Sequence, residues 1–249
     1  LNYQATDEAL LYALVSRGFK AGTFSVLNPP DQLTLDPEYL TSYELGFKTD
    51  WHDNRLRLNG AVFYYDYTDQ QVNTFFPPNV TLVANAAESN ITGAELELLA
   101  RPIPALTLSG AISYLDAEYD QYLATDANGL PVDVSGNRMP YSPEWKFNFA
   151  AQYVFTVGDH GFLTVRGNLN WIDDIYFDHF QNDVLGEDAY TLIDALVRYE
   201  TAGGRWSFEL FGKNLSEEEY YTYKRDALGA VAGIIGAPMT VGFQVVYEH

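Results

Sequence analysis

The sequence lacks cysteine, is poor in basic residues and has no long apolar run. Each of these shortages excludes a type of bond, partner or membrane segment. With no cysteine among the 249 residues, disulfide bonds and thiol chemistry are absent. The 14 lysine and arginine residues are outnumbered by 34 acidic residues. The resulting formal net charge of −20 argues against nucleic acid as a partner. No stretch reaches the roughly 18 consecutive apolar residues that mark a transmembrane helix.

Aromatic residues, by contrast, are abundant. They make up 15% of the chain, and 19 of them are tyrosine. Tyrosine and tryptophan are favoured where one end of a side chain meets lipid and the other meets water. The length fits one large β domain or two ordinary ones.

Two segments, 145–155 and 163–171, alternate apolar with polar residues. Because alternate side chains of a strand point to opposite faces, each segment predicts a strand with one apolar face and one face rich in Asn, Arg and Thr. Such strands are typical of a barrel with lipid outside and water inside. The apolar positions are Trp145, Phe147, Phe149, Ala151, Tyr153 and Phe155 in the first segment, and Leu163, Val165, Gly167, Leu169 and Trp171 in the second.

The same pattern recurs along the chain, and the connections alternate short with long. Short connections rich in Gly, Pro, Asp and Asn are tight turns, which we place in the periplasm, and the long polar loops then lie outside the cell. We predict an all-β fold, an antiparallel transmembrane β-barrel of which about ten strands are present. A soluble sandwich also alternates, but long strands with aromatic ends favour the membrane barrel. The predicted strands are 9–20, 40–51, 55–69, 90–101, 105–118, 143–156, 161–174, 189–200, 205–215 and 238–247.

A series of short motifs spans nearly the whole chain in a fixed order. They are SRGFKAG at 16–22, PE at 37–38, YELGFK at 43–48, VFYYDY at 62–67, NA at 85–86, GAELE at 93–97, GNRMP at 136–140, PE at 143–144, KNL at 213–215 and YY at 220–221. In order and spacing they resemble the C-terminal half of a TonB-dependent outer-membrane receptor.

This resemblance implies a 22-stranded barrel in the bacterial outer membrane, of which the whole chain, residues 1–249, supplies the last strands. It also implies an N-terminal plug domain that engages the TonB complex, and neither the plug nor the TonB-binding segment is in this sequence. The chain begins at Leu1 without a signal peptide, so we expect a mature chain or a fragment. The implied activity is import of a scarce nutrient, a ferric siderophore or similar chelate, with no catalytic residue and no cofactor. The surroundings would be outer-membrane lipid and lipopolysaccharide.

Ligand recognition in the family comes from the extracellular loops and upper lumen, where aromatic side chains with a few polar partners suit a bulky chelate. The scarcity of basic residues favours a hydroxamate-type, neutral or cationic ligand over a highly anionic catecholate. A local basic patch of Arg138, Lys224 and Arg225 remains an alternative. The candidate ligand-binding residues are Tyr122, Arg138, Tyr141, Phe177, His179, Phe180, Tyr220, Tyr223, Lys224 and Arg225.

Three other interpretations stay open at this stage. Asp178 and His179 resemble the Asp–His pairs of the omptin proteases, which are self-closed ten-stranded barrels, although no second histidine lies in a neighbouring loop. A small adhesive barrel is the second alternative. The third is a Ca²⁺ site, because the loop is rich in carboxylates, but no ligand spacing supports it and we expect no metal. These acidic residues are Asp173, Asp174, Asp178, Asp183, Glu187 and Asp188.

Overall fold

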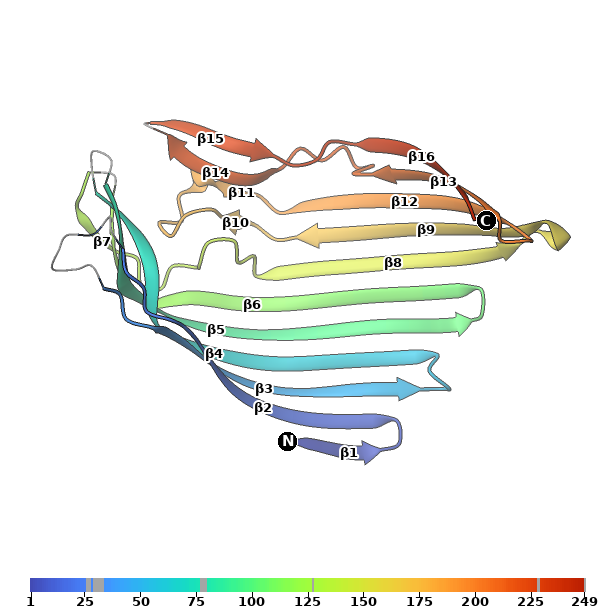
Figure 1. Cartoon of the computed structure of the whole chain (residues 1–249), viewed down its shortest axis with the longest axis horizontal. Coiled ribbons are helices and arrows are strands. Elements are labelled where there is room, and N and C mark those ends of the chain that lie inside the picture. The colour runs from blue at the N-terminus through green and yellow to red at the C-terminus, as the bar shows by residue number, and fades with distance from the viewer. Residues whose placement is uncertain (26–27, 29–33, 77–79, 127, 228, 249) are drawn as a thin grey trace.

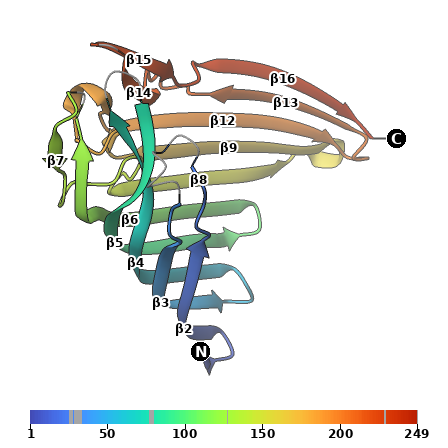
Figure 2. The ribbon, with the colours of Figure 1, turned by 60° about the vertical axis from the view of Figure 1, so that its left-hand side comes forward.

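A computed structural model describes residues 1–25, 28, 34–76, 80–126, 128–227 and 229–248 of the chain. Its main feature is one antiparallel 12-stranded sheet, whose strands follow one another in chain order across a curved, open surface (Figures 1 and 2). The path of the sheet is β1 (Asn2–Thr6), β2 (Ala9–Lys20), β3 (Glu38–Trp51), β4 (Leu56–Phe76), β5 (Val80–Ile103), β6 (Leu106–Thr125), β8 (Trp145–Thr156), β9 (Gly161–Ile172), β12 (Tyr190–Thr201), β13 (Trp206–Lys213) and β16 (Thr240–Tyr247), and β7 (Pro131–Asp133) pairs with β6.

All ten predicted strands are present, and they are β2 to β6, β8, β9, β12, β13 and β16. The prediction missed the short β1, which pairs with β2. It also ended β4 and β6 too early and began β5 too late, because the outer ends of these strands lose the strict alternation of the wall. These three strands continue well past the ends of their neighbours and rise at the left of Figure 1.

The register confirms the two faces expected from the alternation. Phe149 of β8 lies opposite Leu169 of β9, which in turn lies opposite Ile193 of β12. All three are exposed, so they form an apolar outer face. On the other face, Ala150 lies opposite Asn168, and Asn168 opposite Asp194. We call this polar side of the sheet the inner face.

Tight turns close one rim of the sheet. The turn from β3 to β4 places His52, Asp53 and Asn54 in succession at φ values of 55°, 56° and 63°. Asn and Asp tolerate this left-handed region better than other residues with a Cβ atom, which explains why these residues occupy the turn. The turn from β8 to β9 uses a 3₁₀ helix (Gly158–His160) instead.

The long loops at the other rim carry small sheets of their own. β10 (Ile175–Tyr176) pairs with β11 (Gly186–Glu187), on either side of a second 3₁₀ helix (Asp183–Leu185). The hairpin of β14 (Tyr221–Ala227) and β15 (Ala230–Ile235) extends the connection from β13 to β16. The described residues contain no helix long and apolar enough to cross a membrane.

The two ends of the sheet are open. Among the described residues no ladder joins β1 to β16, and in Figure 1 the two strands lie at opposite sides of the sheet. A self-closed ten-stranded barrel would require its first and last strands to pair. The described residues do not show this pairing, so the structure does not show the self-closed barrel on which the protease and adhesin alternatives depend. An unpaired edge cannot face lipid, because its backbone groups would lose their hydrogen bonds.

Candidate functional site

The described residues of 119–142, 173–189 and 216–239 form what we call the loop rim. Its centre is a small hydrophobic core built where β5 and β6 extend beyond the wall. The buried members are Ala87, Tyr119, Tyr122, Ala124 and Val134, and Val72, Ala86, Val132, Met139 and Phe180 pack against them. This core fixes the β6–β7 hairpin against the neighbouring loop, and it explains why the loops here adopt a defined shape.

His179 packs against this core. Its ring lies 5.1 Å from the ring of Tyr122 and 4.2 Å from that of Phe180, measured between centroids. Its backbone carbonyl accepts a hydrogen bond from the Asn137 side chain at 2.9 Å. The buried Nε2 atom has no hydrogen-bond partner among the described residues. Burial lowers the pKa of the imidazole, against the opposing effect of the Asp178 charge.

A second group of candidates forms an aromatic cluster that joins three loops. The ring of Phe177 lies 5.4 Å from that of Tyr141 and 6.5 Å from that of Tyr223. Tyr141 is held by a 3.0 Å hydrogen bond from its backbone nitrogen to the carbonyl of Tyr176, and its φ is 63°. A bulky residue at positive φ is uncommon and carries backbone strain. Tyr141, held in this strained conformation, is 51% exposed.

The two best-placed basic candidates are already neutralised by acids. Arg138 pairs with Asp174 and lies 3.9 Å from Glu144, and its side chain is only 18% exposed. Lys224 lies 2.8 Å from the carboxylate of Glu187 and donates a 2.6 Å hydrogen bond to the carbonyl of Gly186. This second contact ties the β14–β15 hairpin to β11.

The remaining two candidates lie apart from these groups. Tyr220 stacks on Tyr190 with ring centroids 4.6 Å apart, and its ring occupies the space above Gly236, where any Cβ atom would collide with it. Arg225 is exposed on β14 opposite Ala232. The structure therefore divides the ten candidates into a buried core, an aromatic cluster, two neutralised cations and two outlying residues.

Several residues that shape the site were not among the sequence candidates. Tyr190 gave no signal beyond its place at a strand end. In the sequence, Asp174 and Glu187 belong to the acidic group weighed as a Ca²⁺ site, whereas in the structure they are the ion-pair partners of Arg138 and Lys224. Among the described residues no group of three or more His, Asp or Glu side chains is arranged to hold a metal ion.

The fold and the two-faced wall define a class, that of outer-membrane β-barrels. A family model described as "TonB dependent receptor-like, beta-barrel" matches residues 1–215. The chain therefore belongs to the family of TonB-dependent receptors, whose members are outer-membrane barrels. This confirms the family predicted from the motifs.

Sequence comparison with individual receptors agrees with this family. The chain is 30% identical over 233 residues to the probable TonB-dependent siderophore receptor PiuA of Acinetobacter baumannii, covering 89% of this chain and 30% of the relative. It is 28% identical over 219 residues to the metal-pseudopaline receptor CntO of Pseudomonas aeruginosa, covering 88% and 29%. The chain thus spans about 30% of the length of these relatives.

Solved structures share the fold. The ferric yersiniabactin uptake receptor FyuA from Yersinia pestis superposes with a TM-score of 0.82 at 23% identity, over 99% of this chain and 36% of that one. The siderophore receptor PiuA from Acinetobacter baumannii gives 0.76 at 23% identity, over 98% and 34%.

Proposed function

We propose that this chain is the C-terminal part of the barrel, residues 1–249, of a receptor that imports a ferric siderophore with energy from the TonB complex. The observation that carries the proposal is the exposed Tyr141 at the loop rim, which packs on the buried Phe177 beside the partly buried Tyr223. Aromatic faces with a few polar groups suit a bulky chelate. The names of the relatives, receptors of siderophores and of metal–pseudopaline, support the same substrate class.

The charges at the loop rim support an uncharged or weakly charged chelate. Arg138 and Lys224 already have acidic partners, so they offer no free basic patch to a highly anionic ligand. Arg225 is the exposed cation of the three. In a chain of net charge −20, a ligand with several negative charges would be repelled. A hydroxamate-type chelate fits this surface better than a tris-catecholate.

The receptor function leaves no chemical step for the chain, and we expect no cofactor. An omptin-like protease would need His179 as an accessible base. The structure instead buries its Nε2 atom in the aromatic core, and the Asp178 carboxylate accepts a hydrogen bond from the backbone of Asn182 at 3.2 Å. This arrangement favours the receptor over the protease.

The test uses cells that produce the complete receptor. It measures how much radioactive iron these cells take up when the iron is bound to a hydroxamate or to a catecholate siderophore. We expect uptake of the hydroxamate complex, and loss of uptake when TonB is deleted. An antibody against the 216–237 loop should detect an outer-membrane protein of about three times 28.0 kDa, since the chain covers 30% of its relatives. Uptake that does not depend on TonB would contradict the proposal. So would a native protein that the antibody detects near 28.0 kDa.

A further inference from the structure

One strand edge of the loop rim lacks the features that normally protect an unpaired edge. Among the described residues, β7, β10, β11, β14 and β15 each have one edge without a ladder. Natural proteins protect such edges with very short strands, charged side chains or proline. β10 and β11 have only two residues each, and β7 carries Pro131 and Asp133. β14 carries Lys224, Arg225 and Asp226. β15, with the sequence AVAGII, has no such protection.

The side chains of β15 are apolar and exposed as well. Val231, Ile234 and Ile235 are 49%, 60% and 67% exposed. Because successive side chains of a strand alternate, Ile234 and Ile235 place apolar groups on both faces of the hairpin. Charged residues make up 19% of the chain, yet residues 227–247 form its longest stretch without one. An unpaired edge flanked by exposed apolar side chains is a surface to which another strand can be added.

The unpaired edge of β15 continues the open edge of the wall. β15 leads into β16 through residues 236–239, and β14 and β13 pair with the opposite edges of these two strands. In Figures 1 and 2, β15 and β16 lie outside β14 and β13, and both run toward the same end of the sheet. A closed barrel requires a strand antiparallel to β16 along that edge. If this strand continues outward, it meets β15 in antiparallel orientation too.

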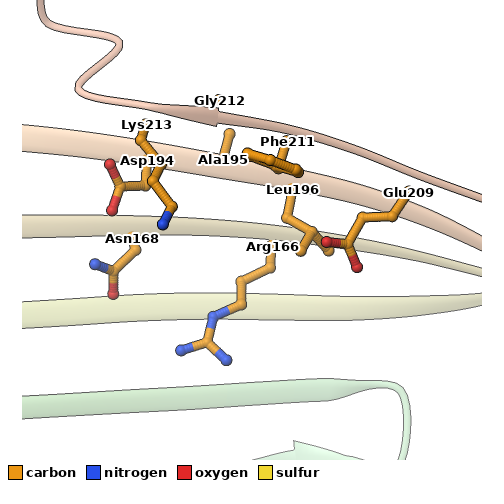
Figure 3. Close-up of a pocket in the computed structure, with 9 residues that line it drawn as sticks. All are labelled: Arg166, Asn168, Asp194, Ala195, Leu196, Glu209, Phe211, Gly212 and Lys213. Atoms are coloured by element: carbon orange, nitrogen blue, oxygen red, sulfur yellow. The ribbon is translucent and has the colours of Figure 1, made fainter. Parts of the chain in front are cut away.

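The recess beside this edge does not reach it. It has a volume of about 450 Å³ on the inner face, and its lining comes from β9, β12 and β13, from Arg166 to Lys213 (Figure 3). β16 follows β13 in the sheet and therefore separates the recess from the open edge. A strand that closes the wall is therefore held by the edge itself, which is β16 in the wall and β15 in the loop rim.

The complete receptor has enough polypeptide to supply such a strand, because the chain covers only 30% of PiuA and 29% of CntO. We propose that β15 pairs along its unpaired edge with an outward extension of the barrel strand that closes the wall against β16. The partner is a segment of the same receptor outside these 249 residues, with apolar side chains against those of β15.

Strands that extend beyond the wall already occur in this chain, since β4, β5 and β6 continue well past their neighbours. Closure of the wall at β16 is expected of any barrel, whereas pairing at β15 carries the closing seam into the loop rim. The inference rests on the proposed function only in requiring a larger closed barrel. The identity of the imported ligand does not enter it.

The direct test is hydrogen exchange at single-residue resolution in the complete receptor. In a strand paired on one side, alternate backbone amides point away from the ladder and exchange fast, whereas pairing on both sides protects all of them. We expect protection at every amide of β15, as at Ala87 and Ser89 of β5, which pair with β4 or β6 on either side. Fast exchange at every second amide of β15 would overturn the inference.

A matched pair of variants tests whether the side chains of β15 are covered. Ile234 and Val184 are exposed to nearly the same extent in this chain alone, 60% and 62%. Ile234→Lys would place a charge against the partner strand and should speed amide exchange in β15 about tenfold or more. Val184→Lys should leave exchange in β15 unchanged. Exchange in β15 that is the same in both variants would contradict the proposed covering.

Photo-crosslinking of the complete receptor identifies the partner. p-Benzoylphenylalanine in place of Ile235 should form a product with a segment of the same polypeptide outside these 249 residues. The same group in place of Arg225, exposed on β14, should not form that product. A product with a second copy of the receptor, or with lipopolysaccharide, would assign β15 to another partner and overturn the inference. A receptor that forms the expected product but imports no ferric chelate would refute the proposed function alone.

Discussion

The wall of ten long strands and the loop rim are stabilised in different ways. In the wall, adjacent strands pair residue for residue, and large apolar side chains such as Phe149 stay exposed on the outer face. In the loop rim, apolar side chains such as Tyr122 are buried, and ion pairs join separate loops. The wall therefore has the exposed apolar face of a membrane protein. The loop rim has the buried apolar core of a small soluble domain.

The largest effect that separates the two regions should come from the core of the loop rim. Tyr122→Ala removes a ring that is 3% exposed and leaves a cavity, which should cost about 3–5 kcal/mol of local stability. Hydrogen exchange in the complete receptor should accelerate at the loop rim and stay unchanged in the wall. Tyr141→Ala, in the same region but half exposed, is the matched control and should cost under about 1 kcal/mol. Equal acceleration in wall and rim would show that the two are not separate units.

The second prediction tests which face of the wall meets lipid. Phe149→Arg places a charge on the outer face near the middle of β8 and should cost about 2–4 kcal/mol of folding free energy in lipid vesicles. Its neighbour Asn148 points to the inner face, so Asn148→Arg should cost less than about 1 kcal/mol. Urea titration of folding into vesicles measures both. The reverse ranking would mean that the faces are assigned the wrong way round.

A third prediction concerns the ion pair that joins two loops. Lys224→Met leaves the Glu187 carboxylate, which is 11% exposed, without its cation, and this should destabilise the β14–β15 hairpin by about 1–3 kcal/mol. Proteolysis of the hairpin should become faster. Glu187→Gln together with Lys224→Met removes both charges and should restore most of the resistance. If the double variant is as sensitive as the single one, the charge of Glu187 is not the cause.

The smallest expected effect is a pH dependence of the loop rim. Burial lowers the pKa of His179, so the folded rim binds fewer protons than the unfolded one just below the ordinary histidine pKa of about 6.5. Stability of the rim should be full above that pH and fall as the pH drops below it. Hydrogen exchange at the rim between pH 7.5 and 5 measures this. His179→Phe should flatten the profile, and a profile that keeps its slope in this variant would assign the effect to another group.

The contrast also explains what the sequence could predict. Alternation is a local signal, so segments such as 145–155 and 163–171 revealed strands, faces and tight turns. The loop rim depends on contacts between distant residues, such as Tyr122 with His179 and Lys224 with Glu187, which no local pattern records. The candidate list therefore named aromatic residues of the loop rim but did not separate those that are buried, such as Tyr122, from those that are exposed, such as Tyr141. Nor did the alternation show that Arg138 and Lys224 would be neutralised.

Ligand binding by the complete receptor tests the central claim, that the wall only spans the membrane while the loop rim binds the chelate. The measurement is a fluorescence titration with a ferric hydroxamate siderophore. Tyr141→Ala should weaken binding about tenfold, equivalent to about 1.4 kcal/mol, since an aromatic contact of ordinary strength is lost. Tyr43→Ala removes a ring of similar exposure, 48% against 51%, from the outer face of β3 and should leave binding unchanged. Equal affinity of the parent receptor and Tyr141→Ala, or a loss confined to Tyr43→Ala, would contradict the claim.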